Sequence, residues 1–196
     1  VKIMFPMISG VGEMLSAREV LDEAKTQLEK RGEAFDPQTP VGCMIETPAA
    51  VTICDLLAEY SDFFSIGTND LVQYLLAVDR INNQIAYLYE PHHPAVIRAM
   101  GHVAEVGRQK GVEVSVCGEM AGDPHFTALL MGLGIDEMSV TPPLIPELKF
   151  FARRFTILEA QKLREEVDRM ERPSQILVRI KAFHDEKMAG VYDVDE

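Results

Sequence analysis

The sequence predicts an α/β fold in which parallel strands alternate with helices. Short apolar runs that end in a polar residue recur along the chain, and the stretches between them have the periodicity of amphipathic helices. Strands that are apolar throughout are typical of buried parallel sheets. We therefore expect either a parallel sheet with helices on both faces or a closed barrel. The chain has 196 residues, 47% of them hydrophobic, which is enough to bury a core.

The first two elements are expected to be a strand and a long helix. Residues 1–5 form an apolar run that Pro6 ends. From Met14 to Leu28, apolar side chains recur at steps of three and four residues, which predicts an amphipathic helix. The Lys-Arg-Gly sequence at residues 30–32 is typical of the C-terminal end of a helix.

Two further pairs of strand and helix follow in the first half of the chain. The apolar run at residues 41–45 predicts a second strand, and helical spacing over 53–60 predicts the helix after it. Two phenylalanines begin another apolar run at residues 62–66, which predicts a third strand. A helix over about 71–77 completes this second pair.

The same alternation continues in the second half. A proline at the first position and basic residues near the last predict a helix over 94–110. A fourth strand is expected at 112–116, followed by a short helix over 125–131. A fifth strand is expected at 137–140 and a helix over 145–154. The predicted order is thus five strands, each followed by helix.

The composition changes at about Phe155, and this divides the chain into two expected regions. Residues 1–154 are expected to form the domain of alternating strands and helices. Residues 155–196 are expected to form charged helices that pack on the outside of that domain, with a frayed acidic tail at 193–196.

The charge and the cysteines limit the classes of function. A formal net charge of −12 argues against binding of nucleic acid or an anionic membrane surface, because such partners require clustered Lys and Arg. No apolar run of 18 residues and no secretory signal pattern is present, so we expect a cytoplasmic chain without membrane contact. Cys43, Cys54 and Cys117 form no CxxC pair, and we expect them to remain thiols.

Three of the predicted strands end in residues that carry chemistry. Glu46 follows the second strand, Asp70 comes shortly after the third, and Cys117 follows the fourth. Because the carboxyl ends of parallel strands meet at one edge of a sheet or one rim of a barrel, we expect these three side chains to converge. This convergence is the main functional prediction from the residues themselves.

Glu46 and Asp70 come from neighbouring strand ends and could share one cation. Mg²⁺ and Mn²⁺ are bound by a few hard oxygen ligands, with water and substrate completing the coordination. The alternative is that Asp70 is only the N-cap of the helix that follows it. Asn69 has a similar ambiguity, because it could be either a turn residue or a hydrogen-bond donor to a ligand.

Two more residues have both a structural and a functional interpretation. Arg80 could complement the C-terminal end of the preceding helix, or it could return over the rim to bind a carboxylate or phosphate. Cys117 could be an inert buried thiol, or it could act as a general acid towards an enolate. Cys43 and Cys54 are expected to be packing residues. The histidines at 92–93 are expected to serve a helix start.

Four motifs of the chain together resemble the phosphoenolpyruvate-binding domain of enzyme I, the phosphoenolpyruvate-protein phosphotransferase family. They are MIETPAA at residues 44–50, SIGTNDLVQY at 65–74, LAVDR at 76–80 and CGEMAGD at 117–123. They occur in the family's order and spacing, and the resemblance covers residues 1–154. Details of residues 75–80, 90–94 and 117–124 are most similar to the nitrogen-related branch of the family.

The resemblance implies a fold and a role for each candidate residue. The family's domain is a TIM (β/α)₈ barrel, and this chain would hold about its last five β/α units together with the C-terminal helices. Glu46 and Asp70 would bind Mg²⁺. Asn69, Asp70 and Arg80 would contact phosphoenolpyruvate, and Cys117 would be the proton donor to the enolate.

The resemblance also implies a reaction and partners. The phosphoryl group of phosphoenolpyruvate would pass to a histidine of the full-length enzyme and then to a histidine-containing phosphocarrier protein, releasing pyruvate. A homodimer is expected, because enzyme I-like proteins dimerise through this barrel. The family's other substrate arginines and its phosphorylated histidine have no counterpart in this sequence, so the chain by itself is expected to be inactive.

Two kinds of alternative remain open. Pyruvate phosphate dikinase and phosphoenolpyruvate synthase share the barrel, the metal carboxylates and the cysteine, but the Gln73-Tyr74 pair and the residues at 77–80 favour enzyme I. The non-enzyme alternative is a catalytically incomplete module for dimerisation and ligand binding.

Overall fold

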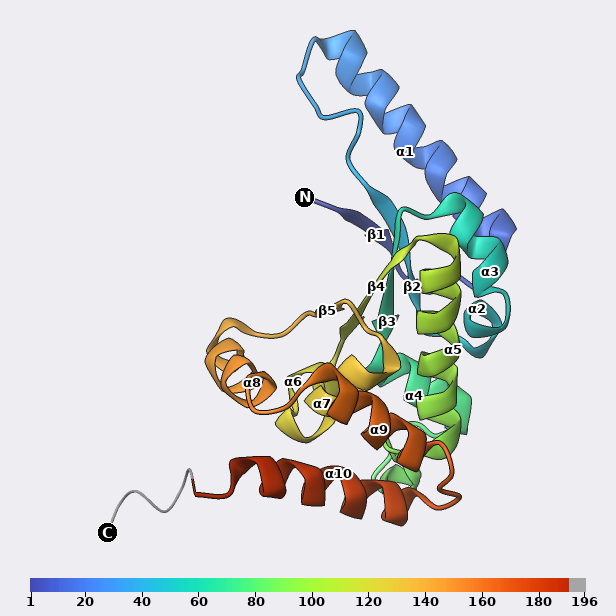
Figure 1. Ribbon diagram of the computed structural model, residues 1–196. Helices are drawn as coiled ribbons and strands as arrows, with labels where there is room; N and C mark the ends of the chain where they lie inside the picture. The colour runs from blue at the N-terminus through green and yellow to red at the C-terminus, as the bar shows by residue number, and fades with distance from the viewer. Residues whose placement is uncertain (191–196) are drawn as a thin grey trace.

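The computed structural model describes residues 1–190 and shows a parallel five-stranded sheet (Figure 1). The strands are β1 (Ile3–Phe5), β2 (Val41–Ile45), β3 (Phe63–Gly67), β4 (Glu113–Cys117) and β5 (Glu137–Met138). They lie in the order of the sequence, and every neighbouring pair is parallel. The predicted α/β class is therefore confirmed, and the arrangement is that of part of a TIM barrel.

Helices connect consecutive strands, as expected for parallel neighbours. They are α1 (Val11–Arg31), α2 (Pro48–Thr52), α3 (Cys54–Leu57), η1 (Ala58–Tyr60), α4 (Thr68–Leu76), η2 (Ala86–Leu88), α5 (Pro94–Lys110), α6 (Glu119–Gly122) and α7 (Pro124–Leu133). After β5 come η3 (Pro142–Leu144) and α8 (Ile145–Ala152). The chain continues through α9 (Ile157–Val167) and α10 (Pro173–Met188).

Three boundaries differ from the sequence prediction. The single helix expected over 53–60 is instead the short helix α3 followed by the 3₁₀ helix η1, and Ile53, with φ −113° and ψ 21°, lies outside both and separates α3 from the preceding α2. The fifth strand stops at Met138 instead of residue 140. Helix α4 begins at Thr68 directly after β3, so the expected turn before residue 71 does not exist.

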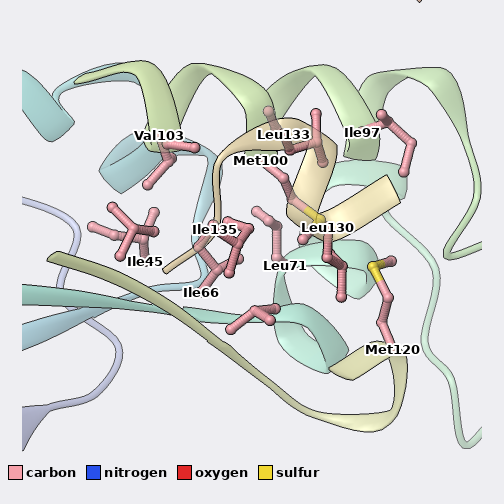
Figure 2. Close-up of a cluster of buried hydrophobic side chains, with 14 of the residues drawn as sticks. Ile45, Ile66, Leu71, Ile97, Met100, Val103, Met120, Leu130, Leu133 and Ile135 are labelled. Carbon is pink, nitrogen blue, oxygen red and sulfur yellow. The ribbon is translucent and has the colours of Figure 1, made fainter. Parts of the chain in front are cut away.

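The main core lies between one face of the sheet and its covering helices. Figure 2 shows buried side chains from the strands meeting side chains of α5 and α7. The labelled members are Ile45, Ile66, Leu71, Ile97, Met100, Val103, Met120, Leu130, Leu133 and Ile135. On the strands these alternate with residues that point to the opposite face, as the pleat requires. The helices therefore hold the sheet in place from one side.

The opposite face of the sheet mixes polar side chains with Met44 and Phe63, and an ion pair bridges it. The Lys2 Nζ atom lies 2.7 Å from a carboxylate oxygen of Glu113 and 3.8 Å from one of Glu137. Lys2 precedes β1, whereas the two glutamates belong to β4 and β5, so the contact passes over β2 and β3. Neighbouring strands lie about 4.8 Å apart, so side chains this far across a sheet converge only over a concave face. The sheet thus has the curvature of a barrel wall.

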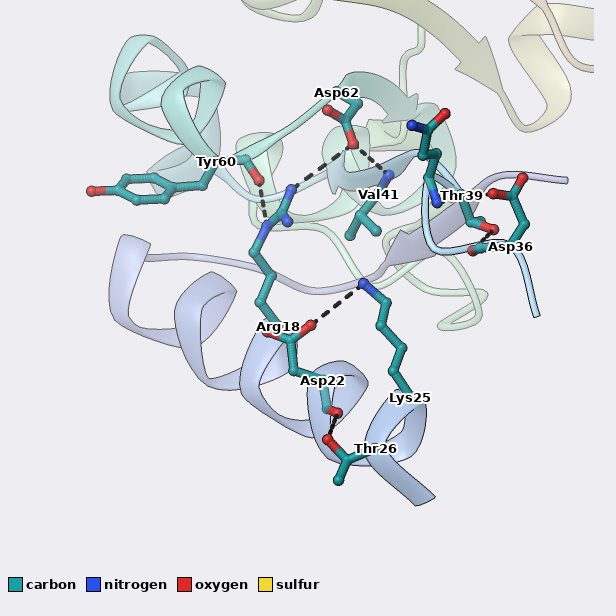
Figure 3. A network of polar contacts seen from close by, with 10 residues as sticks. Arg18, Asp22, Lys25, Thr26, Asp36, Thr39, Val41, Tyr60 and Asp62 are labelled. Atoms are coloured by element: carbon teal, nitrogen blue, oxygen red, sulfur yellow. Dashed lines mark hydrogen bonds and ion pairs between the residues drawn. The ribbon is translucent and has the colours of Figure 1, made fainter. Parts of the chain in front are cut away.

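Polar side chains fix the N-terminal ends of the strands. The Asp62 carboxylate accepts a hydrogen bond of 2.7 Å from the Val41 N–H, and an Arg18 nitrogen lies 4.0 Å from it (Figure 3). Arg18 also donates to the Tyr60 carbonyl oxygen over 2.9 Å, which ties α1 to the segment before β3. At the other side of the sheet, the Asp136 carboxylate accepts a bond of 2.9 Å from the Val114 N–H.

Helices α9 and α10 pack against α7. Thr156 and Glu159 form a capping box at the start of α9, and Lys187 of α10 donates to Glu159 over 2.5 Å. These helices agree with the charged helices expected after residue 155, whereas the expected acidic tail at 193–196 lies outside the described residues. Within residues 1–190, no helix combines the length and the apolar character needed to cross a membrane.

Candidate functional site

The C-terminal ends of β2, β3 and β4 lie at one level and bring the predicted residues together. Ile45 pairs with Ile66, and Gly67 pairs with Cys117, so Glu46 and Cys117 flank Gly67 from either side. A Cβ atom on Gly67 would lie only 2.6 Å from the Oε2 atom of Glu46. Glycine is therefore required here, because any side chain would fill the space between the two flanking residues.

Glu46 is a buried carboxyl with a protein partner on one oxygen. Glu46 is only 2% exposed to solvent, and its Oε1 atom accepts a hydrogen bond of 2.7 Å from the Met7 N–H. Burial raises the pKa of the Glu46 carboxyl, the Met7 N–H opposes the rise, and the negative charge of Asp70 adds to it. The Asp70 carboxylate therefore lies close enough for its charge to act on the Glu46 carboxyl.

Asp70 is the third residue of α4 and faces Arg80. The N-cap of α4 is Gly67, so the interpretation of Asp70 as an N-cap residue is wrong. An Arg80 nitrogen lies 3.6 Å from the Asp70 carboxylate. Helix α4 ends at Leu76 and Ala77 adopts a left-handed conformation with φ 53°, which turns the chain back. Arg80 therefore lies beside the first turn of α4 and does not extend the helix.

Asn69 is held by the loop after β4. Its Oδ1 atom accepts a hydrogen bond of 3.0 Å from the Glu119 N–H, so the amide NH₂ group points away from that loop. Gly118 makes this contact possible, because it has φ 94° and a Cβ atom there would lie 2.8 Å from Asn69 Oδ1. Asn69 is thus a fixed donor at the rim.

Cys117 is the last residue of β4 and is half-buried. Its Sγ atom lies 3.6 Å from the Ile66 carbonyl oxygen, to which the thiol donates. Burial raises the pKa of the Cys117 thiol, the Ser65 hydroxyl opposes the rise, and the charges of Glu46 and Asp70 add to it. The thiol therefore keeps its proton at neutral pH, as a proton donor must.

The other cysteines and the histidine pair have the structural roles that the sequence predicts. Cys43 and Cys54 are fully buried, and burial raises the pKa of each thiol to about 11. His93 is the N-cap of α5, where its Nδ1 atom accepts a hydrogen bond of 3.1 Å from the Ala95 N–H.

Two residues beside the site were missed in the sequence. Tyr89 donates to the Asn69 carbonyl oxygen over 3.2 Å. Burial raises the pKa of the Tyr89 phenol, and the positive charge of neighbouring Arg80 opposes that rise. Met7 supplies the N–H group for Glu46 from a left-handed conformation with φ 57°. A tyrosine in a loop and a methionine after a strand have no pattern that marks such contacts.

Backbone strain also gathers at this rim. Among residues 1–190, the non-glycine residues with positive φ are Met7 and Ala77. Left-handed conformations are unfavourable for residues with a Cβ atom and occur preferentially near functional sites. Here one aims an N–H group at Glu46, and the other brings Arg80 back to Asp70.

A cavity of about 630 Å³ opens beside the site. It shares Asn69 with the predicted site and extends along the segments that follow β4 and β5. Its other lining residues are Gly118, Glu119, Gly122, Asp123, Ser139, Val140, Thr141 and Leu144. Asn69 is thus the one predicted site residue in this lining, and Glu46, Asp70, Arg80 and Cys117 are not part of it.

The residues present fit a divalent cation that keeps open positions. Within the described residues, no three His, Cys, Asp or Glu side chains are grouped as a complete metal site. Glu46 and Asp70 provide two carboxylates against one nearby guanidinium, and Glu46 Oε2 has no hydrogen-bond donor among residues 1–190. Mg²⁺ is commonly held by one or two carboxylates together with water and an anionic substrate.

Comparisons with known proteins identify relatives of this chain. Residues 1–157 match the family described as "PEP-utilising enzyme, PEP-binding domain". The chain is 40% identical over 180 residues to a phosphoenolpyruvate-protein phosphotransferase of Bacillus subtilis, covering 92% of this chain and 32% of the relative. Similar proteins of the same name occur in Cupriavidus necator, 46% identical over 76% of this chain and 25% of the relative, and in Geobacillus stearothermophilus, 43% identical over 85% and 29%.

The extent of these matches identifies the family of the chain. The chain spans between a quarter and a third of the length of the relatives named above. The family match covers the five strands, their connecting helices and all the residues at the rim. This chain therefore belongs to the PEP-binding domain family of PEP-utilising enzymes.

Proposed function

We propose that this chain is the phosphoenolpyruvate-binding part of a phosphoenolpyruvate-protein phosphotransferase. In this reaction the phosphoryl group passes from phosphoenolpyruvate to an enzyme histidine and then to a histidine-containing phosphocarrier protein, and pyruvate is released. The observation that carries the proposal is the meeting of two carboxylates, a returning arginine and a protonated thiol at one rim. The relatives are named phosphoenolpyruvate-protein phosphotransferase, and this name supports the same reaction.

In this proposal Glu46 and Asp70 hold Mg²⁺, and Asn69 and Arg80 bind the substrate. Mg²⁺, when bound, would neutralise charge on the substrate oxygens and on the enolate that remains after phosphoryl transfer. Arg80 offers a guanidinium fork that suits a phosphate or carboxylate group. Asn69 adds an amide donor whose direction is fixed by its bond to Glu119 N–H. Tyr89 donates to the Asn69 carbonyl oxygen and lies close to Arg80.

Cys117 is proposed to complete the reaction as general acid. Its S–H bond breaks, a C–H bond forms at the terminal carbon of the enolate, and the electron pair of the broken bond remains on sulfur. The raised pKa of the thiol keeps the proton in place until the enolate, a stronger base, is present. The product is pyruvate, which retains none of the phosphoryl charge and binds more weakly.

The proposed enzyme acts in the cytoplasm as a homodimer with the phosphocarrier protein as its partner. The three cysteines are free thiols in the structure, which fits a reducing compartment. The acidic chain makes nucleic acid an unsuitable partner.

The test is calorimetric titration of the 196-residue chain with phosphoenolpyruvate, with and without Mg²⁺. Binding should require Mg²⁺ and should disappear in Glu46→Ala. The control variant is Asp62→Asn, which alters a carboxylate at the opposite end of the sheet and should bind as the wild type does. Equal binding with and without Mg²⁺, or unchanged binding by Glu46→Ala, would refute the proposed site.

A phosphoryl-transfer assay separates this proposal from the dikinase and synthase alternatives. The phosphotransferase that contains this domain should phosphorylate a carrier protein from phosphoenolpyruvate without any nucleotide. A requirement for ATP or AMP would assign the domain to one of the alternatives instead.

A further inference from the structure

A buried serine on the neighbouring strand contacts the Cys117 thiol, on the face of the sheet that points away from the main core. Ser65 is in the middle of β3, is 4% exposed, and donates from its Oγ atom to the Cys117 Sγ atom over 3.7 Å. This is the hydrogen bond that its hydroxyl makes within the described residues. An O–H group that bonds only to sulfur gains little stability from the contact, because sulfur is a weak acceptor. Packing alone therefore does not explain a hydroxyl here.

The sulfur of Cys117 is consequently held from two sides. Its own proton points to the Ile66 carbonyl oxygen over 3.6 Å, while Ser65 Oγ donates to it from the neighbouring strand. The Ile66 carbonyl oxygen accepts a hydrogen bond from the thiol, but it cannot stabilise the negatively charged sulfur after the proton has left. The serine can do so, since its O–H bond already points at the sulfur.

We propose that Ser65 is a positioning residue for proton delivery by Cys117. The inference rests on the proposed function and adds a residue to it. Ser65 holds Sγ in one orientation at the rim, and after the proton has moved to the enolate carbon its hydroxyl donates to the sulfur that keeps the electron pair. Ser65 itself loses no proton and does not touch the substrate.

The chain contains two contacts that serve as internal comparisons. Ser61 Oγ donates to Cys43 Sγ over 3.7 Å, the same distance, but Cys43 is fully buried on the helix-facing side of the sheet. Ser115 pairs with Ser65 in the register of β3 and β4, but its hydroxyl bonds to the Phe64 carbonyl oxygen over 3.2 Å. The serine and cysteine contact is therefore not specific by itself. The Ser65 contact differs because its sulfur is half-exposed at the rim.

The first experiment measures alkylation of Cys117 by iodoacetamide in the metal-free 196-residue chain, with the modified cysteine located by mass spectrometry. Ser65→Ala should slow the modification of Cys117 by about three- to tenfold, which corresponds to one typical hydrogen bond. Ser65→Thr, which keeps a hydroxyl, should restore most of the rate. Ser61→Ala and Ser115→Ala should leave it unchanged. An unchanged rate in Ser65→Ala, or an equal loss in Ser61→Ala, would overturn the proposal.

The second experiment separates positioning from folding. In the phosphotransferase that contains this domain, Ser65→Ala should lower kcat for pyruvate formation while leaving KM for phosphoenolpyruvate within about twofold. If Ser65→Ala unfolds the domain, Ser65→Thr must still support turnover, and Ser65→Val, similar in shape but without the hydroxyl, must not. Equal turnover by the Thr and Val variants would refute the role of the hydroxyl. If the alkylation effect appears but phosphoenolpyruvate does not bind at all, the proposed function fails and the contact between Ser65 and Cys117 stands.

Discussion

The two ends of the sheet use the same residue types for opposite purposes. At the N-terminal ends of the strands, Asp62 and Asp136 are exposed and each carboxylate accepts one backbone N–H, as Figure 3 shows for Asp62. At the C-terminal ends, Glu46 is buried and shares its surroundings with Asp70. Asp62 and Asp136 satisfy backbone N–H groups at the starts of strands. Glu46 and Asp70 instead bring two carboxyl groups close together.

The two ends of the sheet differ in the cationic side chains that lie near their carboxylates. At the N-terminal end, Lys2 lies between Glu113 and Glu137, and Arg18 lies near Asp62. At the C-terminal end, Arg80 is the cation within reach of Asp70, and the Glu46 carboxyl has only a backbone N–H. A fold that places carboxylates together without matching cations loses stability there. This difference is the physical basis of the proposed metal site.

The largest expected effect comes from removing either carboxylate at the C-terminal end. Glu46→Ala and Asp70→Ala should each lower Mg²⁺-dependent activity by more than about 10³-fold in the phosphotransferase, because the metal contributes several kcal/mol to the transition state. The measurement is turnover together with Mg²⁺ titration. Asp136→Ala is the matched control at the other end and should keep its turnover. Wild-type metal affinity in either rim variant would show that the paired carboxylates are not the metal site.

The next effect concerns the thiols. Cys117→Ala should lower conversion of phosphoenolpyruvate to pyruvate by about 10²- to 10⁴-fold, with little change in substrate binding, because general acid catalysis acts in the transition state. Cys43→Ala and Cys54→Ala remove buried thiols away from the rim and should retain turnover. Kinetic losses of the same size in all three variants would mean that packing, and not proton transfer, explains Cys117.

At the N-terminal end the expected effect is on stability alone. Asp62→Ala removes the acceptor for the Val41 N–H and should lower the free energy of unfolding by about 1–3 kcal/mol. Urea unfolding of the 196-residue chain measures this change, and turnover in the phosphotransferase should stay unchanged. If Asp62→Ala lowers turnover without lowering stability, then the N-terminal end of the sheet also has a catalytic role and the contrast between the two ends is wrong.

Tyr89 should have a smaller effect at the rim. Tyr89→Phe keeps the ring and removes the hydroxyl that bonds to the Asn69 carbonyl oxygen. Binding of phosphoenolpyruvate should weaken by about three- to tenfold, the value of one hydrogen bond. Calorimetry on the metal-loaded chain checks it. Tyr87→Phe, an exposed tyrosine nearby in sequence, is the control and should bind normally. Unchanged affinity in Tyr89→Phe would remove Tyr89 from the site.

The smallest effect is a pH dependence of stability that comes from Glu46. Its pKa is raised in the folded state above the ordinary value of a glutamate, so the folded protein binds the proton more tightly than the unfolded chain does. In the metal-free protein this contribution is present at low pH and is lost as pH rises from about 4.5 through the raised pKa. Glu46→Gln should remove this slope and make the metal-free chain more stable at neutral pH.

Urea unfolding at a series of pH values measures this slope, and Mg²⁺ should stabilise the wild type but not Glu46→Gln. Asp62→Asn is the control for a general effect of charge removal. If Glu46→Gln is less stable than the wild type at neutral pH without metal, the buried carboxyl does not destabilise the fold.

Much of this architecture follows from patterns in the sequence, and the exceptions have physical causes. Apolar runs and helical spacing predicted the five strands and the long helices α1 and α5, because burial imposes these periods. The helix expected over 53–60 changes from α-helix to 3₁₀ helix after Leu57, and such a change of backbone angles carries no signal in residue type. Strand ends correctly placed Glu46, Asp70 and Cys117 at one rim.

Contacts between distant segments were not predictable in the same way. The return of Arg80 to Asp70 depends on the left-handed Ala77, and alanine gives no warning of that conformation. The bonds from Met7 to Glu46 and from Ser65 to Cys117 depend on strand register, which periodicity does not define between separate strands. The roles of these residues remain predictions until the variants are measured.

The ion pair between Lys2 and Glu113 also has a consequence for folding kinetics. It joins residues that are 111 positions apart, and the strands between them must pair before the two side chains can meet. Closing so long a loop is entropically unfavourable until other contacts hold it, so this pair should form late and contribute little to the folding transition state. Lys2→Met should therefore change the unfolding rate more than the folding rate, which makes the curvature of the sheet one of the last features to appear.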